Sequence, residues 1–279
     1  MFKEQLVPLA SLLGPRYQFT FFEGTVPCEK GPGMPKWYHG PCYAYMTEHS
    51  PRATAKALND LNTFIEDNGP FDGIMGFSHG GAVAASYILD RQIRYRHLPA
   101  PFSFAIFLSP TAPTFPDPSH LHSMIKGLLR DSPPTFLASF PHWDYKLLGP
   151  KERAFSEYLA LYALFLEELG IKIPVLKLDF IQTPNTDDVP RLLHPALIED
   201  RISIPTVHTT GEKEGGMFGQ MASCVQGLCH ESLRRTHRHR GGHSLPLKEH
   251  ELWELASSVH WAAERGGDLT RQHRAGFKL

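Results

Sequence analysis

Apolar positions along the chain alternate between short continuous runs and helically spaced sets. The runs at 71–75 and 102–108 are typical of parallel strands, which carry apolar residues throughout because helices cover both of their faces. Residues 51–68 and 246–265 place apolar side chains three and four positions apart, which predicts two amphipathic helices. Strands that alternate with helices in this way predict an α/β fold, with a mostly parallel sheet and helices on both faces.

Weaker patterns predict the remaining elements. They are a helix at 6–13, an aromatic strand at 17–22, a helix at 81–89, a strand at 202–208 and a basic edge strand at 234–240. Residues 24–49 are rich in proline and aromatic residues and predict a loop. We interpret Trp37, Tyr38 and Tyr43 of this loop as candidates for the mouth of a substrate pocket.

Residues 111–191 interrupt the alternation with many prolines and one strong helical pattern at 151–169. They predict a lid or cap inserted above the sheet of a single domain that spans 1–279, a length that suffices for one sizeable core. The aromatic residues of the predicted lid helix either shape an acyl pocket or pack the lid itself, and packing is the more frequent role.

Composition narrows the classes of function. The formal net charge of −1 gives no overall field for nucleic acid or an anionic membrane, which favours a small, weakly charged substrate. No stretch approaches the roughly 18 apolar residues of a membrane span. The four cysteines form no C-x-x-C pair, so we expect reduced thiols in a cytoplasmic protein: Cys28, Cys42, Cys224 and Cys229.

The most specific chemical signal is the string Gly-Phe-Ser-His-Gly at 76–80, a G-x-S-x-G motif. It lies between the strand predicted at 71–75 and the helix predicted at 81–89, which is the context of a nucleophile elbow in an α/β-hydrolase. The alternative is a chance occurrence in a loop. The flanking strand and helix favour the elbow.

The spacing within the motif has a steric reason. A serine at a sharp strand-to-helix corner leaves no room for side chains two residues before or after it, and Gly76 and Gly80 meet that demand. The corner lifts the hydroxyl of Ser78 clear of the sheet. It also places the backbone N–H of His79 at a helix N-terminus, where it predicts an oxyanion donor.

A nucleophilic serine needs a general base, and the chain has 16 histidines. His243 is the best candidate because it lies in a glycine-rich loop just before the closing helix, from which an imidazole can reach the elbow. His237 and His239 lie in the basic strand and indicate a solvated face. A metal site built from these three histidines is disfavoured, since the neighbouring arginines repel a cation and no carboxylate is interleaved.

The orienting acid is predicted in the loop at 211–216. A carboxylate there follows a strand and lies at the C-terminal edge of the sheet, where open α/β folds place their sites. Glu214 is our choice and Glu212 the fallback. The alternative is that both are solvated loop charges.

Several strings of the chain resemble one known family. This is the serine hydrolase family that includes the human ovarian-tumour-suppressor-like hydrolase, the yeast family serine hydrolases and fungal esterases or thioesterases from polyketide gene clusters. The matching strings lie at 71–78, 104–110, 204–211 and 242–246, with a further likeness at 23–33.

The resemblance implies an α/β-hydrolase fold and a Ser-acid-His esterase or thioesterase whose acid position falls on Glu214. It also implies that a polyketide acyl chain on a carrier protein is a plausible substrate. The chain departs from the family in having Glu214 where an aspartate is usual and His79 where a glutamine is usual. Members of the family open with a strand and an L-H-G-x-G loop that supplies a second oxyanion donor. We expect this strand and this loop to be missing here.

We therefore expect an enzyme that cleaves an ester or thioester through Ser78, Glu214 and His243, with the His79 N–H in the oxyanion hole. Such chemistry needs no metal and no organic cofactor. The expected partners are a small acyl substrate and a polyketide synthase carrier protein, without nucleic acid. The alternatives are a weak or inactive binding protein on the same fold, or a lyase or cyclase that uses the same pocket.

Overall fold

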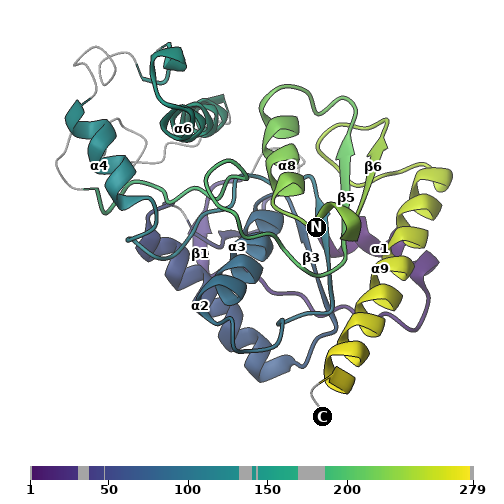
Figure 1. Ribbon diagram of the computed structural model, residues 1–279. Helices are drawn as coiled ribbons and strands as arrows, with labels where there is room; N and C mark the ends of the chain where they lie inside the picture. Colours follow the sequence, from purple (N-terminus) through teal and green to yellow (C-terminus); the bar gives the residue numbers. More distant parts are fainter. Residues whose placement is uncertain are drawn as a thin grey trace. The chain divides into compact units, whose positions relative to one another are not determined.

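A computed structural model describes residues 2–30, 38–46, 48–131, 140–142, 144–168 and 186–276. The chain divides into two compact units, and Figure 1 labels their helices and strands. Unit 1 consists of Met1–Phe22, Phe64–Thr111 and Asp200–Leu279. Unit 2 consists of Glu23–Thr63 and Ala112–Glu199.

A parallel sheet forms the centre of unit 1. Its strands are β3 (Gly73–Phe77), β4 (Phe104–Leu108), β5 (Thr206–Gly211) and β6 (Arg234–His239), in the order β3-β4-β5-β6. The parallel sheet and the basic edge strand are confirmed. β3 and β5 begin and end a few residues later than the apolar runs predict, because a ladder starts where backbone pairing starts and not where side chains become apolar.

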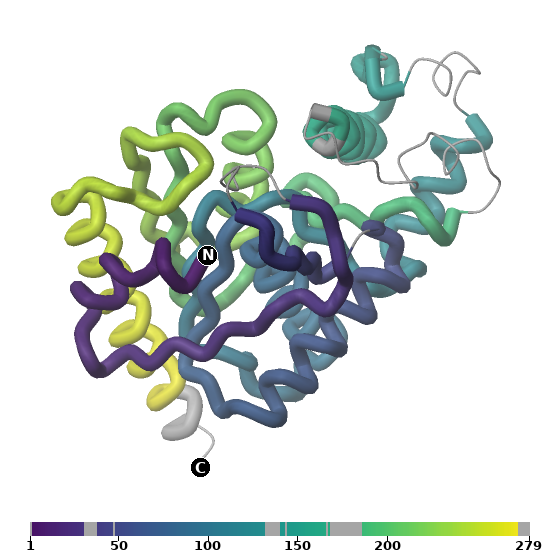
Figure 2. The backbone as a smooth tube through the Cα atoms, turned by 180° about the vertical axis from the view of Figure 1, so that it is seen from behind, coloured from purple at the N-terminus to yellow at the C-terminus, as the bar shows by residue number. Residues whose placement is uncertain are grey.

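Helices cover both faces of this sheet. α1 (Phe2–Leu13) and α9 (Glu249–Gly276) pack together on one face, where their leucines meet Ile106 and Val207 in a common core (Figure 2). Successive side chains of a strand point to opposite faces of the sheet. Gly76 of β3 faces away from α1 and α9 and lies against α3 (His79–Arg94). α8 (Met217–Gly227) packs on β5.

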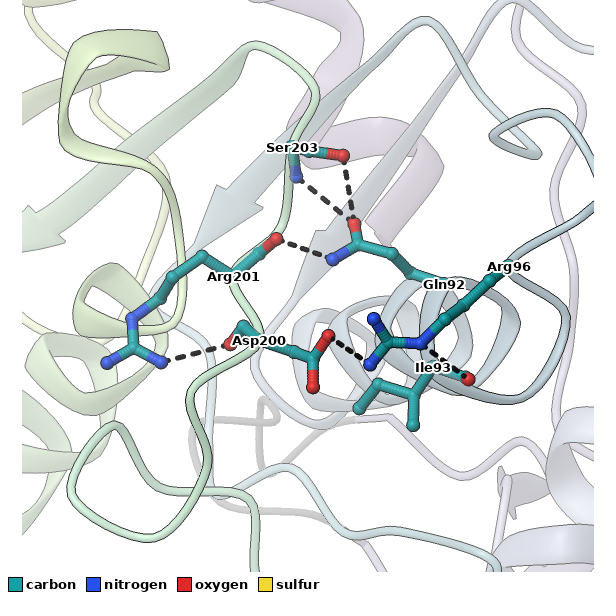
Figure 3. Close-up of polar contacts among 6 residues, drawn as sticks. All are labelled: Gln92, Ile93, Arg96, Asp200, Arg201 and Ser203. Carbon is teal, nitrogen blue, oxygen red and sulfur yellow. Dashed lines mark hydrogen bonds and ion pairs between the residues drawn. The ribbon is translucent and has the colours of Figure 1, made fainter.

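A polar cluster fixes the entry of the chain into β5 (Figure 3). Gln92 of α3 donates to the backbone carbonyl of Arg201 at 2.6 Å and accepts from the N–H and hydroxyl of Ser203 at 3.2 and 3.0 Å. Arg96 pairs with Asp200 at 2.8 Å. α3 and β5, the two elements that border the elbow and the acid loop, are thereby held to one another.

The strand predicted at 17–22 is wrong. Residues 17–22 form no β-strand, although Tyr17, Phe19 and Phe21 pack on the core with the alternation that a strand would have. The alternation therefore reflects one covered side of an extended segment. A strand also needs a backbone partner, which a pattern of side chains does not report.

Unit 2 holds the interrupting region and part of the first long loop. β1 (Val26–Cys28) and β2 (Cys42–Ala44) pair antiparallel, so the prediction that 24–49 is only a loop is wrong at these two short strands. The helices are α4 (His122–Asp131), the short η1 (Tyr145–Leu147) and α6 (Pro150–Glu168). The lid role of 111–191 stays a prediction.

α2 (Pro51–Asn68) begins in unit 2 and ends in unit 1, with the bounds that the sequence predicts. The short η3 (Glu231–Leu233) precedes β6. Inside unit 2, the fully buried Arg191 donates to the backbone carbonyls of Pro118, Thr186 and Val189 at 2.8 to 2.9 Å. Carbonyl acceptors thus satisfy much of this buried guanidinium.

Candidate active site

Ser78 lies at the sharp corner between β3 and α3. Its backbone has φ 53° and ψ −122°, a conformation that non-glycine residues rarely adopt. The corner is held by its own backbone bonds: the Ser78 N–H donates to Leu108 O at 2.9 Å, and the Ser78 carbonyl accepts from the Thr111 N–H at 3.2 Å. Such strain persists only where surrounding contacts fix it, as is common at functional sites.

Gly76 is required by close approach across the corner. A Cβ at this position would lie 2.4 Å from the carbonyl oxygen of Gly80 and 2.6 Å from the Cα of Gly81. Both are backbone atoms, which cannot turn aside as a flexible side chain can. Gly76 therefore meets the steric demand that the motif spacing predicts.

The structure brings Ser78 and His243 together across 165 residues of sequence. His243 Nε2 lies 2.9 Å from Ser78 Oγ, while Nδ1 of the same ring faces the carboxylate of Glu214 in a short hydrogen-bond contact. An imidazole with a hydroxyl at one nitrogen and a carboxylate at the other can take the hydroxyl proton and hold the resulting charge.

Glu214 is buried and firmly anchored. It is 5% exposed, and its Oε2 accepts from the Ser109 hydroxyl at 2.8 Å and from the Gly211 N–H at 2.9 Å, which leaves Oε1 for His243. Glu212, the fallback, is exposed. Of the two carboxylates left open by the sequence, the structure places Glu214 beside the imidazole.

Backbone contacts explain why the acid loop and the histidine loop meet. The Glu212 N–H donates to His239 O at 2.7 Å, and the Lys213 N–H donates to Gly241 O at 3.0 Å. A Cβ on Gly211 would lie only 2.3 Å from the carbonyl oxygen of Gly242. A glycine at the end of β5 therefore lets the two loops approach closely enough for the side-chain contact.

Two aromatic rings flank the imidazole. The ring centroid of His243 lies 4.0 Å from that of Phe218 and 4.9 Å from that of Phe77, and Phe2 stacks on Phe77 at 5.9 Å. Sequence reasoning missed Phe77, Phe218 and Ser109 as site residues. A signal existed for Ser109 and Phe77, since each follows within two residues the C-terminal end of a strand predicted to be buried.

The competing histidines lie elsewhere in unit 1. His208 is buried within the sheet, and desolvation lowers its pKa to about 3. His237 Nε2 contacts the Ser258 hydroxyl at 2.7 Å, and burial lowers the pKa of His239. The His79 side chain is desolvated, which lowers its pKa to about 4, whereas its N–H is the first of α3.

The predicted pocket residues belong to unit 2. Tyr38 donates its hydroxyl to Pro41 O at 3.1 Å, and Tyr43 on β2 is 52% exposed. Trp37 lies outside the described residues. Their role in a pocket stays a prediction.

Within the described part of the chain, the structure contains no helix with the length and apolar character that a membrane span requires. Across the same residues, histidine, cysteine and acidic side chains form no group of three or more that is arranged to hold a metal ion.

Comparisons with known proteins bear on the family to which the chain belongs. The model of the family described as Serine hydrolase (FSH1) matches residues 1–254. The chain is 35% identical to Esterase alnB of Emericella nidulans over 94% of this chain and 91% of that protein. It is 25% identical to Serine hydrolase cnsH of Penicillium expansum over 82% and 93%. Among solved structures, the esterase RhEst1 from Rhodococcus sp. ECU1013 is 13% identical with TM-score 0.40, covering 81% of this chain and 77% of that one.

Proposed function

Because the chain belongs to the Serine hydrolase (FSH1) family and has the α/β-hydrolase fold, we propose that it cleaves acyl esters or thioesters through Ser78, His243 and Glu214. One observation carries the assignment of these roles. Ser78 Oγ, the imidazole of His243 and the carboxylate of Glu214 form a continuous chain of contacts between three separate loops of unit 1.

In the proposed reaction, Ser78 Oγ attacks the acyl carbon while His243 Nε2 takes the hydroxyl proton. The tetrahedral intermediate collapses as the imidazolium returns that proton to the leaving alkoxide or thiolate. Water then attacks the acyl-serine by the same route, which releases the acid and restores the hydroxyl. Glu214 keeps the ring oriented and stabilises its positive charge throughout.

The negative charge of the intermediate needs hydrogen-bond donors. The N–H groups of a helix's first turn have no acceptor within the helix, and α3 begins at His79. The His79 N–H therefore supplies one donor of the oxyanion hole, in a region where the dipole of α3 also favours negative charge.

Within this class, we propose a polyketide acyl chain as the substrate, carried as an ester or as a carrier-protein thioester in the cytoplasm. The support is the resemblance of the elbow and histidine-loop strings to fungal polyketide-cluster esterases. Comparing turnover of a polyketide acyl thioester on a carrier protein with turnover of the same acyl group as a simple ester distinguishes the two forms.

Covalent labelling tests the proposed nucleophile. A fluorophosphonate reacts only with an activated serine, which displaces fluoride and retains the phosphonate. We expect one phosphonate per chain, located on Ser78 by peptide mass spectrometry. A folded chain that stays unlabelled contradicts the proposal and favours the inactive binding protein, whereas a label on another residue contradicts the assignment of Ser78 as nucleophile.

Ser109 is a positioning residue in this proposal, since its hydroxyl holds Glu214 and reaches no reacting atom. A hydrogen bond to a charged group contributes about 1.5–3 kcal/mol, so Ser109→Ala is expected to lower kcat by about 10- to 100-fold with KM little changed. Steady-state kinetics on a p-nitrophenyl ester measures both constants.

Ser109→Gly is the matched control for backbone strain. Ser109 has φ 44°, which glycine adopts without cost and alanine does not. If kcat depends on the Ser109 hydroxyl, it falls by the same factor in Ser109→Ala and Ser109→Gly. The glycine variant is nevertheless expected to unfold at a higher temperature than the alanine variant. A kcat that follows the unfolding temperature instead assigns Ser109 a purely structural role.

A further inference from the structure

Two cysteines of unit 2 lie directly opposite each other. β1 and β2 pair antiparallel with Cys28 opposite Cys42 at one end of the ladder, Pro27 opposite Tyr43 and Val26 opposite Ala44. Both thiols are reduced in this structure. Residues 29–41 connect the two strands, so the sequence separation gives no hint of this juxtaposition.

The register alone sets a distance that suits a disulfide. Directly opposed residues of an antiparallel pair have Cα atoms about 4.5–5.5 Å apart, and disulfides occur at Cα separations of about 4.4–6.8 Å. Opposed side chains also project from the same face of the ladder. A shift of one residue would send the two thiols to opposite faces, so this pairing is specific to the observed register.

Cys28 and Cys42 are both partly exposed. The strands have a half-buried face with Cys28 and Cys42 and an exposed face with Pro27 and Tyr43. The Cys42 thiol donates to the carbonyl of Gly40 across 3.9 Å, which is a long contact. Cys224 and Cys229, by contrast, are buried in unit 1.

The two thiols also interact electrostatically. Burial and the nearby Cys42 thiolate raise the pKa of Cys28, because a second negative charge beside the first is unfavourable. The raised pKa makes Cys28 the poorer first nucleophile, since only a thiolate attacks a disulfide.

We propose that Cys28 and Cys42 form a redox-responsive dithiol that a low-molecular-weight disulfide, such as oxidised glutathione, converts to a disulfide between β1 and β2. The Cys42 thiolate attacks one glutathione sulfur and releases the first glutathione thiolate. The Cys28 thiolate then attacks the Cys42 sulfur of the mixed disulfide and releases the second. Two protein thiols are oxidised, one glutathione disulfide is reduced, and two protons leave.

The bond has a structural consequence for the strand pair. A two-stranded ladder of three residue pairs is marginal in isolation, so a covalent link at its end stabilises pairing. The link holds Tyr43, the neighbour of Cys42, in its place on β2. The proposal is independent of the catalytic assignment, because all of its residues belong to unit 2.

Oxidation of the native full-length chain tests the dithiol. After treatment with oxidised glutathione and removal of the reagent, alkylation under denaturing conditions is expected to count two reactive thiols instead of four. Peptide mass spectrometry is expected to find Cys28 linked to Cys42, and dithiothreitol to reverse the link. Hydrogen exchange at 26–28 and 42–44 is expected to slow in the oxidised form.

Three variants make the result specific. Cys28→Ser is expected to stop at a stable glutathione adduct on Cys42, which shows that Cys28 resolves the intermediate. Cys224→Ser and Cys229→Ser are expected to leave the Cys28 to Cys42 link unchanged. Four reactive thiols after treatment, adducts on both Cys28 and Cys42 without a link, or a link between other cysteines overturns the proposal.

Discussion

Ser78→Ala is expected to abolish hydrolysis of a p-nitrophenyl ester, with kcat lower by about a million-fold, as is typical when the nucleophile of a serine hydrolase is removed. The methyl group keeps the size of the side chain nearly unchanged but offers no oxygen for the acyl group. Residual turnover then comes only from oxyanion stabilisation and binding by the rest of the site. Initial rates at saturating ester, on a fully purified variant, measure this loss.

Ser86→Ala is a matched control because Ser86 also belongs to the elbow's helix, α3, and is 1% exposed. It is expected to retain kcat within a few-fold even if its thermal unfolding temperature falls, since its hydroxyl is outside the contact chain. Ester hydrolysis that survives in Ser78→Ala, or a comparable loss in Ser86→Ala, would place the nucleophile elsewhere.

Glu214→Gln is expected to lower kcat by about ten-thousand-fold. In the Ser-His-Asp template, replacing the acid by its amide has an effect of this size because the imidazole takes the wrong tautomer. The same reasoning applies here. The glutamine amide is neutral, so it cannot stabilise the imidazolium, and its NH2 group can donate to Nδ1 and leave the proton on Nε2, the nitrogen that faces Ser78.

Glu212→Gln removes the same charge from the same loop and is the matched control. Glu212 is exposed, and its backbone N–H donates to His239 O at 2.7 Å. We expect its kcat within about two-fold of the parent chain, measured with the same ester and ionic strength. Equal losses in the two variants would mean that loop charge, rather than the Glu214 contact with His243, supports the reaction.

Local sequence was sufficient for the features that depend on a few consecutive residues. The elbow was predicted because its glycine spacing has a steric cause within one pentapeptide, and Gly76 shows that cause as a 2.4 Å approach to the backbone of Gly80. Buried strands such as β4 and the bounds of α2 were predictable for the same reason, since apolar runs and helix ends are encoded by neighbouring positions. His243 was identifiable because few histidines lie in a glycine-rich loop.

Backbone pairing between segments that are distant in the sequence determined the features that local sequence did not predict. The sequence favours Glu214 and keeps Glu212 as the fallback, whereas the contact of the acid loop with the histidine loop is what turns Glu214 inward and leaves Glu212 in solvent. Ser109 gains its meaning from a glutamate 105 residues away. Alternation at 17–22 resembles a strand but reflects one side of an extended segment packed on the core, whereas Cys28 and Cys42 become neighbours through register. Residue patterns encode local conformation and burial, while the separation of distant side chains is set by how strands and loops pair.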